Sequence, residues 1–307
     1  MEKKVKKMKY GMPYKGSKNK LAGHIFELFP RKKNFYDLFC GGCAMTHYGL
    51  LHGGFENFYM NDINPACSEL FMDAVHGKFK DEKRWISRED FEKLKDVEPY
   101  VAFCWSFGNN LRSYLYSKEI EELKRVWHYA IFFDDFEPFK KYGVDMSAIK
   151  GIKNRYEKYL TSKDILRKCR LEVSERLETF ERLQSLVSLE RLERLERLRI
   201  TVGSYEQVEI LPDSVIYCDI PYEGTNDYLT DFDFEKFYSW CEKQTEPLFI
   251  SSYKMPSDRF VCVAMFKHRC TLSATENIEV TEKVFIPKHQ EKEYHLPGSL
   301  FNFDEMM

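Results

Sequence analysis

The chain has 307 residues, of which 43% are hydrophobic and 31% are charged. This balance is typical of a globular protein, and the length favours two folded units over one. No stretch approaches the roughly 20 continuous apolar residues that a transmembrane helix needs. The basic N-terminus has no apolar segment behind it, so we expect neither a membrane span nor a signal peptide, and we expect a cytoplasmic protein.

The use of cysteine and lysine narrows the class of protein further. Nine cysteines are scattered through a long chain, which predicts reduced thiols rather than a disulfide framework. Cys40 and Cys43 are spaced like a metal-binding pair, but no second pair stands at zinc spacing, so we expect small buried residues in a turn and no metal site. The first twenty residues carry eight lysines, including Lys9 and Lys15, although the formal net charge is only −2. Such a terminus is either a solvated surface or a contact for phosphates.

The first quarter of the chain alternates apolar runs with segments of helical pattern. A helix is expected over residues 21–30, and a buried strand over 34–39 leads through a glycine turn into a helix over 44–53. A second strand over 55–62 is followed by a helix over 64–75. Alternation of this kind indicates βαβ units and a parallel sheet.

The middle of the chain has a different pattern. Residues 83–199 are rich in aromatic and charged side chains and mostly helical in pattern, which predicts an insertion into the α/β sheet. At its end, residues 183–199 repeat leucine at a spacing of three. Three residues turn an α-helix by about 300°, so these leucines drift around the axis and never form one stripe. Glu–Arg pairs four residues apart keep a helix plausible, but we interpret the repeat as a spacer and assign it no chemistry.

The last third returns to the α/β pattern. Short apolar runs bounded by turn residues predict strands over 214–219, 247–253 and 282–287, and residues 232–243 predict a helix between the first two. The sequence therefore predicts one α/β domain, formed by residues 1–82 and 200–307, that the mostly helical region 83–199 interrupts.

The most distinctive motif is Cys218-Asp219-Ile220-Pro221-Tyr222, at the end of the strand expected over 214–219. The carboxyl ends of strands are where open α/β sheets build their sites. A carboxylate, carbonyls left free next to a proline, and an aromatic face suit a flipped base that carries an amino group. A short motif of this kind also fits a turn that ends a strand, so it needs support from elsewhere in the chain.

A second motif indicates a nucleotide-like ligand. Asp37-Leu38-Phe39-Cys40-Gly41-Gly42 ends the first strand in a glycine turn, where backbone can approach a ligand closely. Asp62 stands twenty-one residues after Gly41, near the spacing at which an acid holds ribose hydroxyls. Asp62 also suits a plain turn before Pro65, and the pattern does not separate NAD from S-adenosylmethionine.

Taken in order, these motifs resemble the Dam-like, D12-class adenine-specific DNA methyltransferases. Residues 13–18, Pro-Tyr-Lys-Gly-Ser-Lys, are similar to the family's N-terminal motif, and the glycine loop and Asp62 are similar to its cofactor site. Cys218–Tyr222 is similar to the catalytic Asp-Pro-Pro-Tyr motif, and the strands over 247–253 and 282–287 to those that wall the adenine pocket. The resemblance covers about residues 9–75 and 205–288. It departs from the family at Cys43, where a second glycine is expected, and at Ile220, which replaces the first proline.

The resemblance implies a Rossmann-like methyltransferase sheet, S-adenosylmethionine as cofactor and double-stranded DNA as partner, with 83–199 as the target-recognition region. The methyl group would pass directly to the N6 amino group of a flipped adenine. The implied catalytic residues are Asp219, Ile220, Pro221 and Tyr222. The implied cofactor residues are Tyr14, Lys18, Asp37, Phe39, Gly41, Gly42, Asp62 and Asp219. The candidate DNA contacts are Lys9, Lys15, Asn109, Asn110 and Arg112, since Asn and Arg read base edges.

Other functions stay open at this stage. A related enzyme would methylate cytosine N4 or an RNA adenine, and a protein of a different class would keep the fold and bind DNA or cofactor without catalysis. A dehydrogenase would leave the Cys218–Tyr222 motif without a role. A restriction endonuclease is a conceivable partner for such an enzyme, but no motif in the sequence identifies one.

Overall fold

The structure is a computed structural model that describes residues 9–169, 171, 176–192, 195–221, 232–270 and 278–292. The chain divides into two compact units. Unit 1 comprises residues 1–72 and 191–307, and unit 2 comprises residues 73–190.

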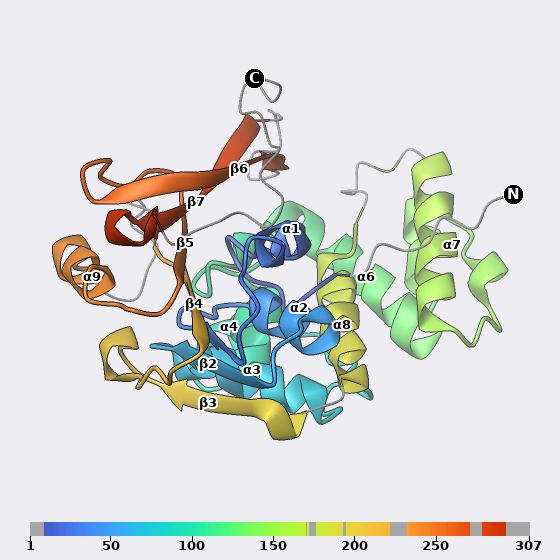
Figure 1. Ribbon diagram of the computed structural model, residues 1–307. Helices are drawn as coiled ribbons and strands as arrows, with labels where there is room; N and C mark the ends of the chain where they lie inside the picture. The colour runs from blue at the N-terminus through green and yellow to red at the C-terminus, as the bar shows by residue number, and fades with distance from the viewer. Residues whose placement is uncertain are drawn as a thin grey trace, which may run out of the picture. The chain divides into compact units, whose positions relative to one another are not determined.

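Unit 1 is built on a seven-stranded sheet in its described residues, with the strand order β3-β2-β1-β4-β5-β7-β6 (Figure 1). The strands are β1 Asn34–Asp37, β2 Asn57–Asp62, β3 Leu198–Val202, β4 Ser214–Asp219, β5 Leu248–Ser252, β6 Phe260–Cys270 and β7 Ile278–Pro287. The strands β3, β2, β1, β4 and β5, which are neighbours in that order, are parallel. The strand β7 pairs antiparallel with both β5 and β6. The chain leaves β1 toward β2 on one side and returns to β4 on the other, so the strand order reverses at β1, where open α/β sheets bind ligands.

Helices cover both faces of this sheet. The helices of unit 1 are α1 Ala22–Phe26, α2 Ala44–His52 and α9 Phe234–Cys241, and α3 Pro65–Val75 crosses the boundary between the units. On one face, Phe26 of α1 packs against Phe35 of β1 with ring centroids 5.0 Å apart. On the other face, Phe237 of α9 belongs to a buried cluster with Tyr36 and Ile216. Alternation of side chains along each strand produces these two cores.

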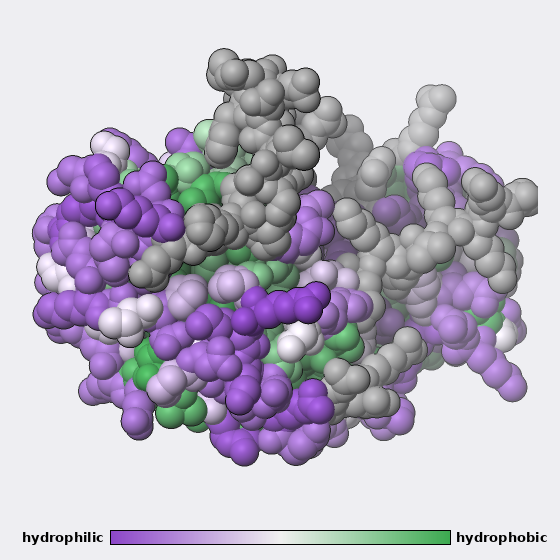
Figure 2. All heavy atoms as spheres, in the orientation of Figure 1, coloured by the Kyte–Doolittle hydropathy of each residue, from purple (hydrophilic) through white to green (hydrophobic). Residues whose placement is uncertain are grey.

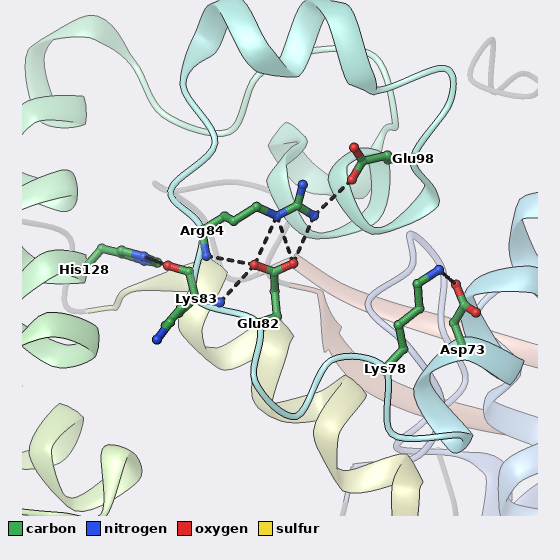
Figure 3. Close-up of polar contacts among 7 residues, drawn as sticks. All are labelled: Asp73, Lys78, Glu82, Lys83, Arg84, Glu98 and His128. Atoms are coloured by element: carbon green, nitrogen blue, oxygen red, sulfur yellow. Dashed lines mark hydrogen bonds and ion pairs between the residues drawn. The ribbon is translucent and has the colours of Figure 1, made fainter.

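Unit 2 is mostly helical. Its helices are α4 Arg88–Leu94, α5 Pro99–Trp105, α6 Lys118–Phe133, α7 Arg155–Lys168 and α8 Glu178–Ser188. Polar contacts fix the segment before α4, as Figure 3 shows. Glu82 accepts hydrogen bonds from the backbone amides of Lys83 (2.9 Å) and Arg84 (2.8 Å), and the Arg84 guanidinium also lies 3.0 Å from Glu98. These charges are thus satisfied within the unit and carry no sign of a ligand site.

Three parts of the fold differ from the sequence-based expectation. The end of the leucine repeat is neither a helix nor only a spacer, because Leu198–Val202 forms the edge strand β3. The strand β6 was not expected. The sheet is not wholly parallel, because β7 runs against β5 and β6. Two further observations concern the surface: no helix in the described residues is long and apolar enough to cross a membrane, and hydrophilic residues predominate on the face in Figure 2.

Candidate active site

Three aspartates end three adjacent parallel strands. Asp37 is the last residue of β1, Asp62 of β2 and Asp219 of β4. Because parallel strands end at the same edge of a sheet, these three residues lie at one edge, where the strand order reverses. Sequence reasoning selected all three positions, and the structure brings them together.

The glycine loop is tied to Asp62. The backbone amide of Gly41 donates to one carboxylate oxygen of Asp62 (2.8 Å), and the amide of Asn64 donates to the other (2.9 Å). Burial raises the pKa of Asp62, while these amides act to lower it. Each carboxylate oxygen has a second lone pair, so Asp62 can still accept hydrogen bonds from ligand hydroxyls.

The segment Gly11–Tyr14, here called the N-terminal strap, lies directly against the glycine loop. The amide of Met12 donates to the Gly42 carbonyl at 2.7 Å. A Cβ atom on Gly41 would stand 2.7 Å from the Tyr14 ring, and one on Gly42 would stand 2.6 Å from the Tyr14 Cβ. Both distances are shorter than any ordinary contact, so only glycine allows the loop and Tyr14 to pack this closely.

Lys18 binds the carboxylate of Asp219. Its Nζ lies 2.6 Å from one oxygen and 2.7 Å from the other, and it also donates to the Gly16 carbonyl at 3.1 Å. The lysine side chain is only 4% exposed, whereas the aspartate side chain is 22% exposed. Burial raises the pKa of Asp219, and the Lys18 ammonium opposes that shift. A buried ammonium needs such a partner, so the pair fixes the aspartate at the edge of the sheet.

Asp37 is the most deeply buried of the three carboxylates. One of its oxygens accepts hydrogen bonds from the Thr46 hydroxyl (2.7 Å) and the Thr46 amide (3.1 Å). Burial raises the pKa of Asp37 to about 7, with Asp219 and Asp62 adding to the rise and Thr46 opposing it. Burial therefore disfavours the charged form of the Asp37 carboxyl.

The two departures from the family pattern have physical explanations. Cys43 takes a left-handed conformation (φ 55°, ψ 29°), a region that favours glycine, and its buried side chain lies 3.7 Å from the Cys40 sulfur. Both thiols are buried, as expected. Ile220 is 2% exposed within the core cluster under α9, so an apolar side chain there contributes packing.

The other candidate residues are more dispersed. Phe39 packs against Tyr205 with ring centroids 5.3 Å apart, and Pro221 follows Ile220 at the end of β4. Tyr222 lies outside the described residues. Lys9 is exposed and Lys15 is partly buried; both belong to unit 1.

The three DNA-contact candidates Asn109, Asn110 and Arg112 belong to unit 2 and lie in one tight turn. Gly108, Asn109 and Leu111 all have a positive φ there. The side-chain oxygen of Asn110 accepts from the amide of Arg112 at 2.9 Å. Asn110 thus stabilises the turn itself, and a role of these residues on DNA stays a prediction.

Sequence reasoning missed two residues beside Lys18. The hydroxyl of Ser17 is buried without a hydrogen-bond partner. Glu282 on β7 is 3% exposed, and one of its oxygens lies 3.9 Å from the Lys18 ammonium. The serine stands within the recognised Pro13–Lys18 motif, so its buried hydroxyl could have been suspected. No local pattern relates Glu282 to a lysine near the N-terminus.

Comparison with known proteins supports the family resemblance in the first part of the chain. Residues 14–133 match the family model of the D12 class N6 adenine-specific DNA methyltransferases. The resemblance seen in the motifs is confirmed by this match over residues 14–133. The matched residues include the glycine loop and Asp62 but end before Asp219.

Other comparisons add little. No curated protein matches the sequence. Among solved structures, the rRNA methyltransferase aviRa from Streptomyces viridochromogenes is similar at 14% identity with a TM-score of 0.35, over 87% of this chain and 84% of that one. A likeness of this size carries no argument about function.

Proposed function

We propose that the protein transfers a methyl group from S-adenosylmethionine to the N6 amino group of a flipped adenine in double-stranded DNA. The observation that carries this proposal is the meeting of Asp219, Asp37 and Asp62 at one edge of the sheet, next to a glycine loop that no larger residue could form. The family match supports the same reaction.

The residues of the loop suit the cofactor. Asp62 retains lone pairs for ribose hydroxyls, and Gly41 and Gly42 let the backbone approach the ligand. Tyr14 and Lys18 would cover the methionine end, with Asp37 and Phe39 beside them. When bound, S-adenosylmethionine supplies an electrophilic methyl group on its sulfonium.

Asp219 and Ile220 would activate the adenine. The exocyclic amine is a weak nucleophile because its lone pair is delocalised into the ring. Hydrogen bonds from its protons to the Asp219 carboxylate and the Ile220 carbonyl would localise that pair and stabilise the positive charge that grows on nitrogen. Pro221 would restrict the backbone beside Ile220. Tyr222, which lies outside the described residues, would stack on the base and contribute roughly 1–3 kcal/mol to its binding free energy.

DNA recognition is proposed for the inserted region 83–199, through the turn that contains Asn109, Asn110 and Arg112. Lys9 and Lys15 would contact phosphates. A change at the turn should alter sequence preference, whereas a change at either lysine should weaken binding to all sequences alike.

The test is incubation with labelled S-adenosylmethionine and unmethylated DNA, followed by analysis of the nucleosides. N6-methyladenine is the expected product. N4-methylcytosine, or label only in RNA, would refute the proposed substrate, and cofactor binding without any transfer would refute the proposed reaction.

A further inference from the structure

Lys18 lies between two buried carboxylates on the same face of the sheet. Asp219 pairs with Ser251 in the register of β4 and β5, and Ser251 pairs with Val284 of β7. Glu282 is two residues before Val284, so Asp219 and Glu282 project from one face, since side chains alternate along a strand. Lys18 lies 2.6 Å from the first carboxylate and 3.9 Å from the second.

The observed arrangement conflicts with the chemistry proposed for Asp219. Both of its oxygens are bound to the Lys18 ammonium. The adenine amino group can share one of those oxygens through its second lone pair, but it then competes with the ammonium for the same acceptor. An ammonium held on the same carboxylate would also oppose the positive charge that develops on the amine. Methyl transfer is therefore favoured when the lysine moves away from at least one oxygen.

We propose that Glu282 is a positioning residue that takes over the Lys18 ammonium when the active site fills, so that Asp219 turns one oxygen to the adenine. This inference rests on the function proposed above. The exchange requires only that the ammonium move from one carboxylate toward another that is already 3.9 Å away.

The contact of Glu282 with Lys18 favours it over Asp37 in this role. One Asp37 oxygen already accepts two hydrogen bonds from Thr46, and burial raises the pKa of this carboxyl, which disfavours its charged form. Glu282 is held by the pairing of β7 with β5 and β6. In the described residues, the titratable groups that interact with Asp219 include Lys18 before α1, Asp37 on β1, and Tyr217 and Cys218 on β4. Glu282 on β7 lies beside Lys18.

A charge-removing variant tests the exchange. Glu282→Gln should lower kcat by about tenfold or more, with KM for DNA changing less than about threefold. Removal of a negative neighbour should also lower the pKa of Asp219, so the acid limb of the pH profile of kcat should move to lower pH. Glu282→Asp keeps the charge and should keep the acid limb at its wild-type position.

Lys283→Gln is the matched control, because the neighbouring side chain projects from the opposite face of β7 and should leave both readouts unchanged. A Glu282→Gln enzyme with wild-type kcat and pH profile overturns the exchange. So does a lower kcat with an unmoved acid limb, which indicates a merely structural role. If the wild-type enzyme transfers no methyl group, the proposed function itself fails.

A crystal structure of the wild-type protein tests the same point without a variant. The complex would contain S-adenosylhomocysteine and a DNA duplex that the enzyme methylates. We expect the Lys18 Nζ about 3 Å from a Glu282 oxygen, with one Asp219 oxygen on the adenine amino group. A lysine that still holds both Asp219 oxygens, beside a flipped adenine, contradicts the proposal.

Discussion

Substitution of Gly41 by alanine tests whether the glycine loop and the N-terminal strap are packed against each other as described. Gly41 has a φ of 45°, in the left-handed region, and its hypothetical Cβ would stand 2.7 Å from Tyr14 Cε1 and 3.0 Å from Cδ1. Two separate costs follow. The backbone conformation costs an alanine about 1–2 kcal/mol, and the overpacking against the ring costs about 1–3 kcal/mol.

A double-mutant cycle separates these costs. Tyr14→Ala removes both ring atoms, so in that background Gly41→Ala should cost only the backbone term, about 1–2 kcal/mol. The coupling between the two positions should therefore be about 1–3 kcal/mol. The assay is the free energy of unfolding from urea titrations of all four proteins.

The control for this cycle is Gly54→Ala, whose added Cβ has no atom within 4 Å and no left-handed backbone. It should change the free energy of unfolding by less than about 0.5 kcal/mol. If Gly41→Ala costs the same with and without the Tyr14 ring, the close packing of strap and loop is refuted.

Three further predictions concern other parts of the chain. Burial lowers the pKa of His47 from 6.5 to about 4, so the unfolded state takes up its proton first and stability is lost as pH falls from 6.5 toward 4, by about 3 kcal/mol in all. His47→Asn keeps an acceptor for the Gly11 amide and should lose that much less stability over this range in urea titrations; equal losses would contradict the assignment. Glu178→Gln leaves the buried Lys124 ammonium without its carboxylate and should cost about 1–3 kcal/mol of unfolding free energy. Glu137→Gln breaks only an exposed pair with Lys140 and should cost less than about 0.5 kcal/mol; similar costs for both would count against a special role of the Lys124 pair. Asp62→Asn should weaken binding of S-adenosylmethionine by about tenfold or more in calorimetry, and an unchanged Kd would remove Asp62 from the site.

The centre of the fold could be predicted from sequence because three neighbouring strands are short, largely apolar runs that each end in an aspartate. The runs before Asp37, Asp62 and Asp219 correspond to β1, β2 and β4. Parallel pairing then places their ends at one edge without any further information. The glycine loop and its spacing to Asp62 could also be predicted, because both are local features of the sequence next to strand ends.

The edges of the sheet and the lysine network could not be predicted in this way. Four of the five residues of β3 are exposed, so the strand has no alternation of buried and exposed side chains, and its sequence continues a leucine repeat. The contact between Lys18 and Asp219 joins residues 201 positions apart. The contact of Lys18 with Glu282 depends on the antiparallel placement of β7, which no local pattern specified.

The central claim is that the Asp219 carboxylate acts on the adenine amino group. The most direct measurement is the single-turnover rate of labelled methyl transfer to adenine N6 by Asp219→Asn, at saturating S-adenosylmethionine and with folding checked by circular dichroism. The amide keeps the shape of the side chain but loses the charge that would stabilise the growing cation, so the rate should fall by about 100-fold or more. A folded Asp219→Asn protein that transfers the methyl group at the wild-type rate would contradict the account.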